Sequence, residues 1–372
     1  MSDKDSNHHI ENDPDFKGLK VNEGIPRPNS VSNDSVEKFL RKNRKLLPVQ
    51  DYVDGILAGD ITLLSKAVTL IESVNVKHQK LAQDIITKCL PYSGNSVRVG
   101  ITGVPGVGKS TFIEALGGFI TNSGGKLAVL AIDPSSERTK GSILGDKTRM
   151  EELSGDKNAY IRPSPTVGSL GGVARKTRET IILCEAAGYD HILVETVGVG
   201  QSETAVHSMT DFFLLLMLAG AGDELQGIKR GIMEMADVIA INKADGSNIE
   251  KAQMARVQYQ NAIHLFPKKD SNWDSKVLTC SATKRDGVSE IWKQIEQFII
   301  LTKKNEYFNT RRNEQSIYWM HETIEEQLRR NFYDHHEIKE RLKTLENNVL
   351  NDKMSSFIAA GKLLEMYYKM KE

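Results

Sequence analysis

The sequence predicts an α/β fold in which a mostly parallel β-sheet carries helices on both faces. Short β-branched runs alternate with helical stretches between about residues 93 and 304. Strands that are separated by helices require crossover connections, which produce parallel strands covered on both sides. The flanking regions have helical patterns without strand-like runs. We therefore expect a sheet domain with N-terminal helices and a C-terminal helical extension.

The strand candidates are six short apolar segments, at residues 97–102, 127–132, 191–195, 212–218, 237–241 and 277–280. In parallel sheets of this kind, ligands bind at the carboxyl ends of the strands. Residues that directly follow these segments are therefore the first candidates for a functional site.

The chain divides into four expected regions. Residues 1–35 are polar and lack aliphatic periodicity, which predicts a disordered tail. Residues 36–92 form an N-terminal helical segment, in which Asp60 can cap a helix and a second helical run stops at Leu90-Pro91. The amphipathic helix after Asp60 is indicated by Leu63, Leu64, Ala67, Leu70, Ile71 and Val74. Residues 93–304 are the sheet domain, and residues 305–372 are a C-terminal helical arm.

The bulk composition restricts the partners and the compartment. Lys and Arg total 49 and Asp and Glu total 49, so a net charge of +0 argues against nucleic acid or an anionic membrane as partner. Cys89, Cys184 and Cys280 are far apart in apolar runs, which suits a reducing compartment. The acidic start resembles neither a secretory nor a mitochondrial leader. The longest apolar run, residues 212–220, is too short to span a bilayer. We expect a cytoplasmic protein.

A glycine-rich loop between the first strand candidate and a helical stretch is the strongest motif. Its residues are Gly103, Val104, Pro105, Gly106, Val107, Gly108, Lys109 and Ser110, followed by Thr111. Glycines let backbone N–H groups point at phosphates, and the following helix N-terminus adds positive potential. The lysine would bridge the outer phosphates and the serine would bind magnesium. This segment is therefore predicted to be the phosphate-binding loop of a P-loop nucleotide-binding protein.

A second motif, Asn242-Lys243-Ala244-Asp245, follows the apolar strand candidate 237–241. The Asp245 carboxylate can accept the N1 and N2 hydrogens of guanine, whereas adenine has no N1 hydrogen. Lys243 can lie along the base, and Asn242 can tie its loop to the phosphate loop. A backbone contact to the guanine carbonyl is expected at Ser281, Ala282 and Thr283, after the last strand. The motif therefore predicts GTP or GDP as ligand.

Magnesium requires oxygen ligands near the outer phosphates. Beside Ser110, the candidates are Asp133, Asp146 and Glu195, which lie after or at the ends of strand candidates. Gln201 follows Glu195 in a glycine-containing stretch and could orient the attacking water, although a plain polar loop role explains it equally well. The nine histidines show no metal-binding spacing.

The motifs also resemble one GTPase family over longer strings. The matching strings are VGITGVPGVGKSTFIEAL (99–116), DPSS (133–136), GSILGDKTRM (141–150), RPSPTVGSLGGVAR (162–175), ETVGVGQSE (195–203) and GAGDELQGIKRGIME (220–234). They are similar to the methylmalonyl-CoA mutase-associated GTPases of the MeaB or ArgK type, in register from about residue 57 to the C-terminus. Two residues differ from the usual pattern, namely Lys140 and Ala219, and both lie in the expected switch loops.

The resemblance implies a GTPase of the signal-recognition-like class that forms a homodimer through C-terminal helices. It also implies a role as chaperone of an adenosylcobalamin-dependent acyl-CoA mutase, with Ser110, Asp133, Asp146 and Glu195 around magnesium. The mobile loop 218–229 would join nucleotide state to the partner through Asp223, Gln226 and Lys229. The residues expected to act in hydrolysis are then Lys109, Asp133, Gln201 and Lys229.

Three alternatives remain open at this point. A metal-delivery GTPase would need a His or Cys ligand set, which the sequence does not offer. A transport-linked kinase activity that uses ATP is sometimes attached to this family by name. Asp245 argues against ATP as the nucleotide. Finally, Ile338, Leu342, Leu345 and Val349 form the apolar seam of a helix pair. This seam could pack either on the chain's own core or on a second subunit.

Overall fold

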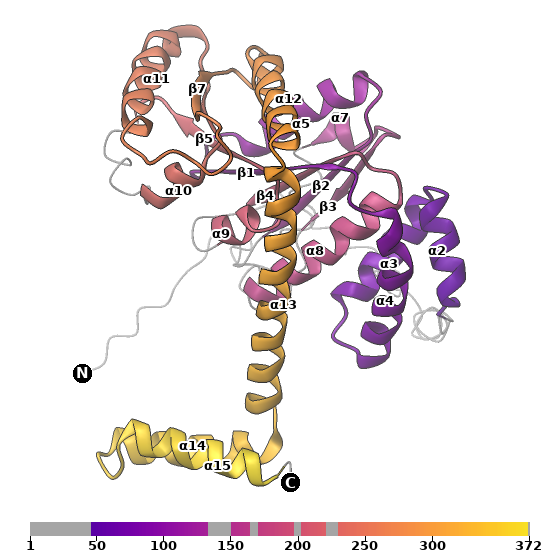
Figure 1. Cartoon of the computed structure of the whole chain (residues 1–372), viewed down its shortest axis with the longest axis vertical. Helices are drawn as coiled ribbons and strands as arrows, with labels where there is room; N and C mark the ends of the chain where they lie inside the picture. Colours follow the sequence, from indigo (N-terminus) through magenta and orange to yellow (C-terminus); the bar gives the residue numbers. More distant parts are fainter. Residues whose placement is uncertain (1–45, 133–149, 164–169, 197–201, 221–229, 371–372) are drawn as a thin grey trace, which may run out of the picture. The chain divides into compact units, whose positions relative to one another are not determined.

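The computed structural model describes residues 46–132, 150–163, 170–196, 202–220 and 230–370 (Figure 1). The expected tail and the first residues of the expected N-terminal helical segment lie outside the described residues. The division of the chain into four regions therefore stays a prediction.

A seven-stranded sheet forms the centre of the fold, and all of its strands are parallel. The strand order is β3-β2-β4-β1-β5-β6-β7. Their bounds are β1 (Val97–Gly103), β2 (Leu127–Ile132), β3 (Ala159–Arg162), β4 (His191–Thr196), β5 (Phe212–Leu218), β6 (Val238–Asn242) and β7 (Lys276–Thr279). All six predicted strands are present within one residue of their expected ends. The predicted fold class is confirmed.

The sequence analysis missed one strand, β3, which pairs only with β2 at the edge of the sheet. It has four residues, of which only Tyr160 is buried, and it ends in the charged Arg162. An edge strand that buries so little needs no apolar run, so its sequence carries no strong strand pattern.

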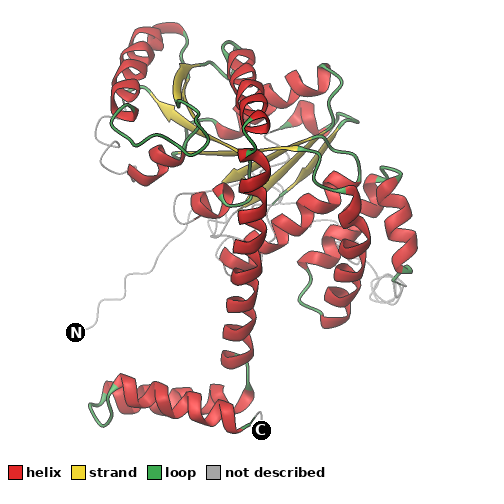
Figure 2. Ribbon diagram, viewed as in Figure 1, coloured by secondary structure: helices red, strands yellow, loops and turns green. Residues whose placement is uncertain are grey.

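Both faces of the sheet are buried, because successive side chains of each strand point to opposite sides. Leu214 and Leu216 join a core cluster with helices α5 (Lys109–Asn122) and α12 (Val288–Lys304). Leu215 and Met217 join a second cluster with α10 (Arg230–Met235) and α11 (Ile249–Ile263). Figure 2 shows helices on both sides of the strands. The other described helices of this region are α7 (Glu151–Ser154), α8 (Leu170–Ala186), α9 (Ser202–His207) and the 3-10 turn Gly246–Asn248.

In the described part of the chain, three helices precede the sheet, α2 (Val49–Leu57), α3 (Ile61–Glu72) and α4 (Val76–Cys89), followed by a 3-10 turn at Leu90–Tyr92. The carboxylate of Asp60 caps α3, since it accepts hydrogen bonds from the backbone N–H groups of Thr62 (2.7 Å) and Leu63 (3.1 Å). The predicted cap is therefore confirmed. The prediction that Val74 belongs to the apolar face of this helix is wrong, because Val74 lies beyond the end of α3 and is 65% exposed.

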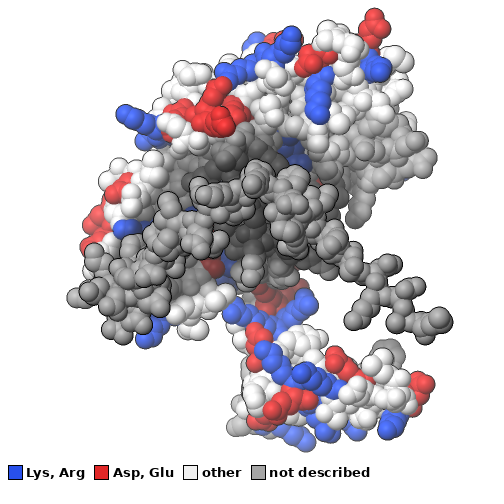
Figure 3. Space-filling model, turned by 180° about the vertical axis from the view of Figure 1, so that it is seen from behind, with Lys and Arg blue, Asp and Glu red and all other residues white. Residues whose placement is uncertain are grey.

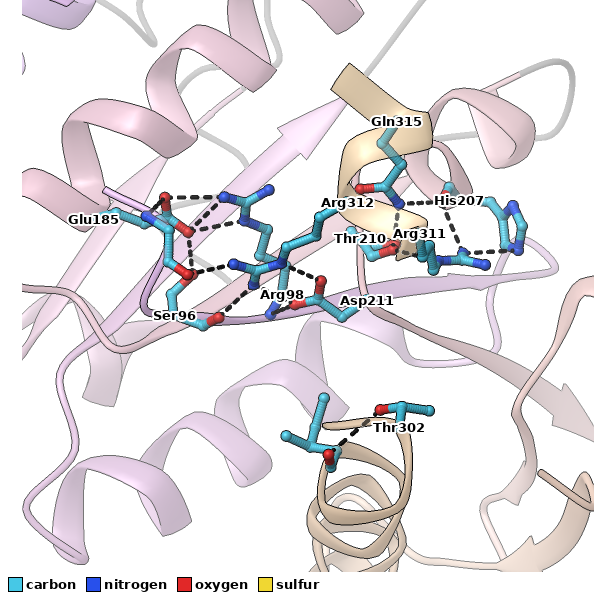
Figure 4. Close-up of polar contacts among 12 residues, drawn as sticks. Ser96, Arg98, Glu185, His207, Thr210, Asp211, Thr302, Arg311, Arg312 and Gln315 are labelled. Atoms are coloured by element: carbon cyan, nitrogen blue, oxygen red, sulfur yellow. Dashed lines mark hydrogen bonds and ion pairs between the residues drawn. The ribbon is translucent and has the colours of Figure 1, made fainter. Parts of the chain in front are cut away.

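Three helices follow the sheet domain, α13 (Tyr307–Tyr333), α14 (His336–Leu350) and α15 (Ser356–Lys369). Polar contacts attach α13 to the amino ends of the strands (Figure 4). The guanidinium group of Arg312 forms an ion pair with Asp211 (2.7 Å) and also donates to the carbonyl oxygen of Ser96. Both charged side chains of this pair are largely buried, with 13% and 2% exposure.

The predicted apolar seam of α14 packs on α15 of the same chain. Ile338 and Leu345 are 0% and 2% exposed, and they lie in a small cluster with Ala359, Leu363 and Tyr367. Within the chain, the seam therefore packs on a later helix rather than on the sheet domain, and its packing on a second subunit stays a prediction. In Figure 1 the two yellow helices lie side by side.

Charged side chains are intermixed on the described surface. On the face drawn in Figure 3, Lys and Arg alternate with Asp and Glu along the C-terminal helices and around the sheet domain. Among the described residues, no helix has both the length and the apolar composition that crossing a membrane requires.

Candidate nucleotide-binding site

The predicted phosphate loop connects β1 to α5, the arrangement that this motif requires. Gly103 begins the loop so close to β5 that a Cβ atom would lie 2.4 Å from the carbonyl oxygen of Leu216. Gly108, with φ 92°, precedes α5, and no side chain caps the first N–H groups of this helix. These N–H groups are therefore available to an anion, as phosphate binding at a helix N-terminus requires.

The side chain of Lys109 folds back into the loop. Its Nζ donates to the carbonyl oxygen of Gly103 at 2.8 Å, with Val104 O farther away at 3.5 Å. Burial lowers the pKa of Lys109, while the nearby carboxylates of Glu195 and Glu203 act in the opposite direction. The ammonium group thus lies inside the loop with two acids close enough to affect its charge.

Two members of the predicted magnesium set lie side by side. The hydroxyl of Ser110 donates to Oε1 of Glu195 at 3.4 Å, and Glu195 is only 6% exposed at the end of β4. Near the ends of β1 and β4, the hydroxyls of Thr102 and Thr196 are 2.9 Å apart. A hydroxyl and a carboxylate beside a phosphate loop are oxygen ligands that suit Mg²⁺. The other two predicted ligands, Asp133 and Asp146, lie outside the described residues.

Asn242 joins the two loops of the site. Its Nδ2 donates to the carbonyl oxygen of Val107 at 2.8 Å, and its Oδ1 accepts from the backbone N–H of Ala282 at 3.1 Å. Asn242 is 1% exposed at the end of β6. A Cβ atom at Gly108 would lie 3.0 Å from the same amide nitrogen, so a glycine at this position allows the close approach. One buried amide therefore connects the phosphate loop to two expected base-binding loops.

The expected base-binding residues are held by local contacts. The hydroxyl of Ser281 donates to the carboxylate of Asp245, and the backbone N–H of Ala244 donates to the carbonyl oxygen of Cys280. Lys243 adopts a left-handed backbone conformation with φ 57°, and its carbonyl oxygen accepts from the amide of Asn248. These contacts bring Asp245 beside Ser281, although 36 residues separate them in the chain.

Of the other predicted site residues, some lie in the described part of the chain and some do not. Pro105 and Gly106 are exposed in the phosphate loop, Thr111 is exposed on α5, and Thr283 is exposed after Ala282. The predicted residues Gln201, Asp223, Gln226 and Lys229 lie outside the described residues, and so does Lys140. Ala219 directly follows β5 and packs against the cluster formed by β5, β6 and α11.

The structure adds one acid that the sequence analysis did not select. Glu203 lies in the first turn of the short helix α9, is 3% exposed, and opposes the lowering of the pKa of Lys109. It was within the quoted string 195–203, but no strand end or ligand spacing distinguished it from a solvated loop residue.

Comparison with known proteins identifies the family to which these residues belong. The family model described as "Methylmalonyl Co-A mutase-associated GTPase MeaB" matches residues 64–337, which is more than half of the chain. The chain belongs to the MeaB family. This membership, together with the phosphate loop between β1 and α5, makes it a GTP hydrolase, so the predicted family and enzyme class are confirmed.

Individual relatives of this MeaB-family chain carry several names. A probable GTPase of Mycobacterium tuberculosis (strain ATCC 25618 / H37Rv) is 47% identical over 321 residues, covering 85% of this chain and 95% of the relative. GTPase ArgK of Escherichia coli (strain K12) is 45% identical over 297 residues, covering 79% and 90%. The Mus musculus protein named "Methylmalonic aciduria type A homolog, mitochondrial" is 44% identical over 332 residues, covering 86% and 80%.

A solved structure supports the same architecture. The crystal structure described as "LAO/AO transport system kinase" superimposes with a TM-score of 0.70 at 36% sequence identity, covering 87% of this chain and 99% of the other. The names of these relatives describe those proteins, and what they imply for this chain belongs to its proposed function.

Proposed function

We propose that this MeaB-family GTPase binds GTP with Mg²⁺ and serves as a chaperone of an adenosylcobalamin-dependent acyl-CoA mutase of the methylmalonyl-CoA mutase type. In this role hydrolysis would protect or reactivate the mutase, or load its cofactor. The observation that carries the proposal is the hydrogen bond from Asn242 to Val107, which fixes the Asp245 loop beside the phosphate loop. A nucleotide could then contact both loops at once.

Selection of guanine rests on Asp245. Its carboxylate is already oriented by the Ser281 hydroxyl, so it can accept hydrogen bonds from the base without first being ordered. Adenine would offer no donor to the acceptor positions of Asp245 that Ser281 leaves for the base, which is expensive in a partly buried site. The arrangement therefore supports GTP and GDP as the ligands.

The magnesium proposal rests on Ser110 and Glu195, whose side chains approach each other beside the phosphate loop. These residues fit Mg²⁺, which prefers one or two carboxylates together with phosphate and water oxygens. A bound Mg²⁺ would neutralise charge on the outer phosphates during hydrolysis. We propose Asp133 and Asp146 as the remaining members of this set.

The mutase partner is supported by the family description and by the name of the mouse relative. We propose that loop 218–229 couples nucleotide state to the partner, with Asp223, Gln226 and Lys229 as its working side chains. A cation that a partner moves against the γ-phosphate would supply transition-state stabilisation worth roughly 10³- to 10⁵-fold in rate.

A homodimer is the proposed assembly, and two features of the C-terminal helices support it. Leu350, Phe357 and Tyr368 are 80%, 88% and 63% exposed, although all are large apolar or aromatic side chains. An apolar groove of about 620 Å³ lies between α14 and α15, and residues such as Leu342 and Leu364 line it. A second copy that covered these side chains would remove them from water.

The proposed compartment is the cytoplasm, without a nucleic-acid or membrane partner. Cys89, Cys184 and Cys280 are buried and free, and burial raises the pKa of each thiol. Buried reduced thiols of this kind suit a reducing compartment.

The test measures phosphate release from GTP by the purified protein, with and without an adenosylcobalamin-dependent acyl-CoA mutase from the same cell. We expect the mutase to accelerate hydrolysis. Lys229→Ala should lose most of this stimulation but keep the slow intrinsic rate and the affinity for GDP. Lys251→Ala is the matched control, because Lys251 is exposed on α11. Stimulation that is equal in Lys229→Ala and wild type would remove Lys229 from the coupling, and no stimulation of the wild type would refute the partner.

A transport-linked kinase that uses ATP is the second candidate, because a solved structure with 36% sequence identity carries that name. Competition between GTP and ATP for the purified protein separates the two candidates directly. If ATP competed as well as unlabelled GTP, the guanine assignment of Asp245 would fail.

A further inference from the structure

We propose that Thr102 and Thr196 are positioning residues for Mg²⁺. Their hydroxyl groups hold the end of β1 to the end of β4 and so fix the separation of the two proposed magnesium ligands, Ser110 and Glu195. This inference deepens the proposed function, because it rests on Ser110 and Glu195 as ligands. Neither threonine belongs to the predicted nucleotide or magnesium sets.

The sheet divides between β1 and β4 at its carboxyl edge. The two strands are neighbours (Figure 1), and the last pair in their register is Ile101 with Glu195. Beyond this pair each strand follows its other neighbour, since Thr102 and Gly103 pair with β5 and Thr196 pairs with β2. Open parallel sheets bind ligands where the connections from two neighbouring strands lead to opposite faces. At this point the backbone pairing between β1 and β4 ends, so their last residues need another contact to stay together.

A hydrogen bond between two side chains continues the connection by one residue. The hydroxyl oxygens of Thr102 and Thr196 are 2.9 Å apart, and the two residues are 2% and 0% exposed. Each hydroxyl is both a donor and an acceptor, so the two groups can satisfy each other away from water. Because a buried hydroxyl without a partner is costly, this bond resists separation of the two strand ends.

The threonine pair and the proposed ligands lie on opposite faces of the sheet. Successive side chains of a strand alternate, so Glu195 and Thr196 point to different sides. On one side Glu195 meets Ser110 of α5. On the other side lies Gly100, which shares a face of β1 with Thr102 and where a Cβ atom would be 2.7 Å from a side chain of α9. The threonines therefore support the ligands from the opposite face and do not compete with them for the metal.

The other neighbour of β1 fixes the same strand end. Gly103 directly follows Thr102, and it lies so close to β5 that a Cβ atom would be 2.4 Å from the carbonyl oxygen of Leu216. The carbonyl oxygen of Gly103 in turn accepts from Nζ of Lys109 at 2.8 Å. The start of the phosphate loop is thus held by close packing against β5 on one side and by the Thr102 hydroxyl on the side of β4.

The separation of β1 from β4 matters because the two proposed ligands come from different strands. Ser110 follows the loop that leaves β1, whereas Glu195 belongs to β4 itself. Mg²⁺ requires near-ideal octahedral geometry with short bonds to oxygen. A shift of one strand end relative to the other should therefore weaken Mg²⁺ binding more than it weakens the contacts of a nucleotide with the phosphate loop alone.

The first test removes the hydroxyls but keeps the shape of the side chains. Thr102→Val, Thr196→Val and the double variant are titrated by calorimetry with a non-hydrolysable GTP analogue, once with Mg²⁺ and once with EDTA. We expect Mg²⁺ to increase the affinity of the wild type, and this increase to be roughly 10-fold smaller in each variant, with little change in the affinity in EDTA. Thr102→Ser keeps the hydroxyl and should keep most of the increase. Thr302→Val is the matched control, because Thr302 is also 0% exposed and its hydroxyl donates within α12.

The double variant separates positioning from stability. A single valine leaves one buried hydroxyl without its partner, whereas two valines leave none. We therefore expect the midpoint of chemical unfolding, measured without nucleotide, to fall in each single variant and to recover in the double variant. The magnesium-dependent increase in affinity should stay small in the double variant, because the bond between the strand ends is still absent.

Four results would contradict the proposal. An unchanged magnesium-dependent increase in the single variants would show that the threonines do not position the ligands. Full recovery of this increase in the double variant would assign the defect to an unpaired hydroxyl rather than to the lost bond. Additive midpoint changes would show that the two hydroxyls do not act on each other. An affinity of the wild type that is the same with Mg²⁺ and with EDTA would refute the proposed magnesium set, and this inference with it, whatever the midpoints of the variants.

Discussion

The side-chain amide of Asn242 donates to the backbone carbonyl oxygen of Val107 over 2.8 Å, across 135 residues of sequence. The same side chain accepts from the backbone of Ala282. Three loops that follow three different strands are therefore held by one buried residue. Its removal should affect both the folded structure and the nucleotide site.

Asn242→Ala should lower the free energy of unfolding by about 2–4 kcal/mol, because two buried backbone groups lose their partners. GTP affinity should fall by at least roughly 10-fold, since the base loop and the phosphate loop would no longer be connected. Chemical denaturation and calorimetry measure these effects. Asn248→Ala is the control, because its amide bonds only to Lys243 O in the more exposed part of the same loop. Wild-type affinity in Asn242→Ala would show that the connection does not matter for binding.

Asp245→Asn should shift the preference from guanosine to xanthosine nucleotides, because an amide can donate to the xanthine carbonyl whereas the carboxylate only accepts. Competition binding with GTP and XTP measures this preference. Ser281→Ala removes the hydroxyl that orients Asp245, so it should weaken GTP binding without changing the preferred base. A strong GTP preference retained in Asp245→Asn would refute its assignment to the base.

His207 should make the protein less stable in acid. The guanidinium group of Arg311 donates to its Nε2 at 3.0 Å, which requires a neutral ring, and burial together with Arg311 and Lys269 lowers its pKa from 6.5 to about 3. The stabilisation from this neutral ring is fully present above the unfolded pKa of 6.5 and is lost as the pH falls toward about 3. The slope approaches about 1.4 kcal/mol per pH unit within this window.

Denaturant unfolding at several pH values between roughly 4 and 7 tests this pH dependence of stability, because most of this range lies between the folded and unfolded pKa values of His207. His207→Gln keeps a hydrogen-bonding side chain but cannot be protonated. The slope of the unfolding free energy against pH should therefore fall by an amount that corresponds to about one proton. His264→Gln is the control, because His264 is exposed on the surface. An identical slope in His207→Gln and wild type would show that His207 protonates normally in the folded protein.

A chain that ends at Tyr333 should be a monomer with normal nucleotide affinity. This cut removes α14 and α15, which form a cluster of their own, and it keeps the Arg312–Asp211 pair that attaches α13 to the sheet. Light scattering measures the mass, and calorimetry measures GDP binding. A truncated chain that remained dimeric would place the subunit interface outside the two removed helices.

The sequence by itself determined the parts of this protein that depend on local pattern. Six strands, the phosphate loop and the Asp60 cap were all predicted, because apolar runs, glycine spacing and a cap followed by a helix are properties of neighbouring residues. Asn242 could also be expected to bond to the phosphate loop, since its motif follows a strand whose carboxyl end meets that loop. The site was therefore predictable wherever a motif directly follows a buried strand.

Only the tertiary structure decided the relations between distant segments. It showed the edge strand β3, whose short sequence has no distinctive pattern, and it showed that α15 packs on the seam of α14. It also brought Ser281 to Asp245, although 36 residues separate them in the chain. The physical reason is that strand order and helix packing set such contacts. A sequence pattern fixes which side of its own element a residue occupies, whereas the packing of other elements decides what lies against that side.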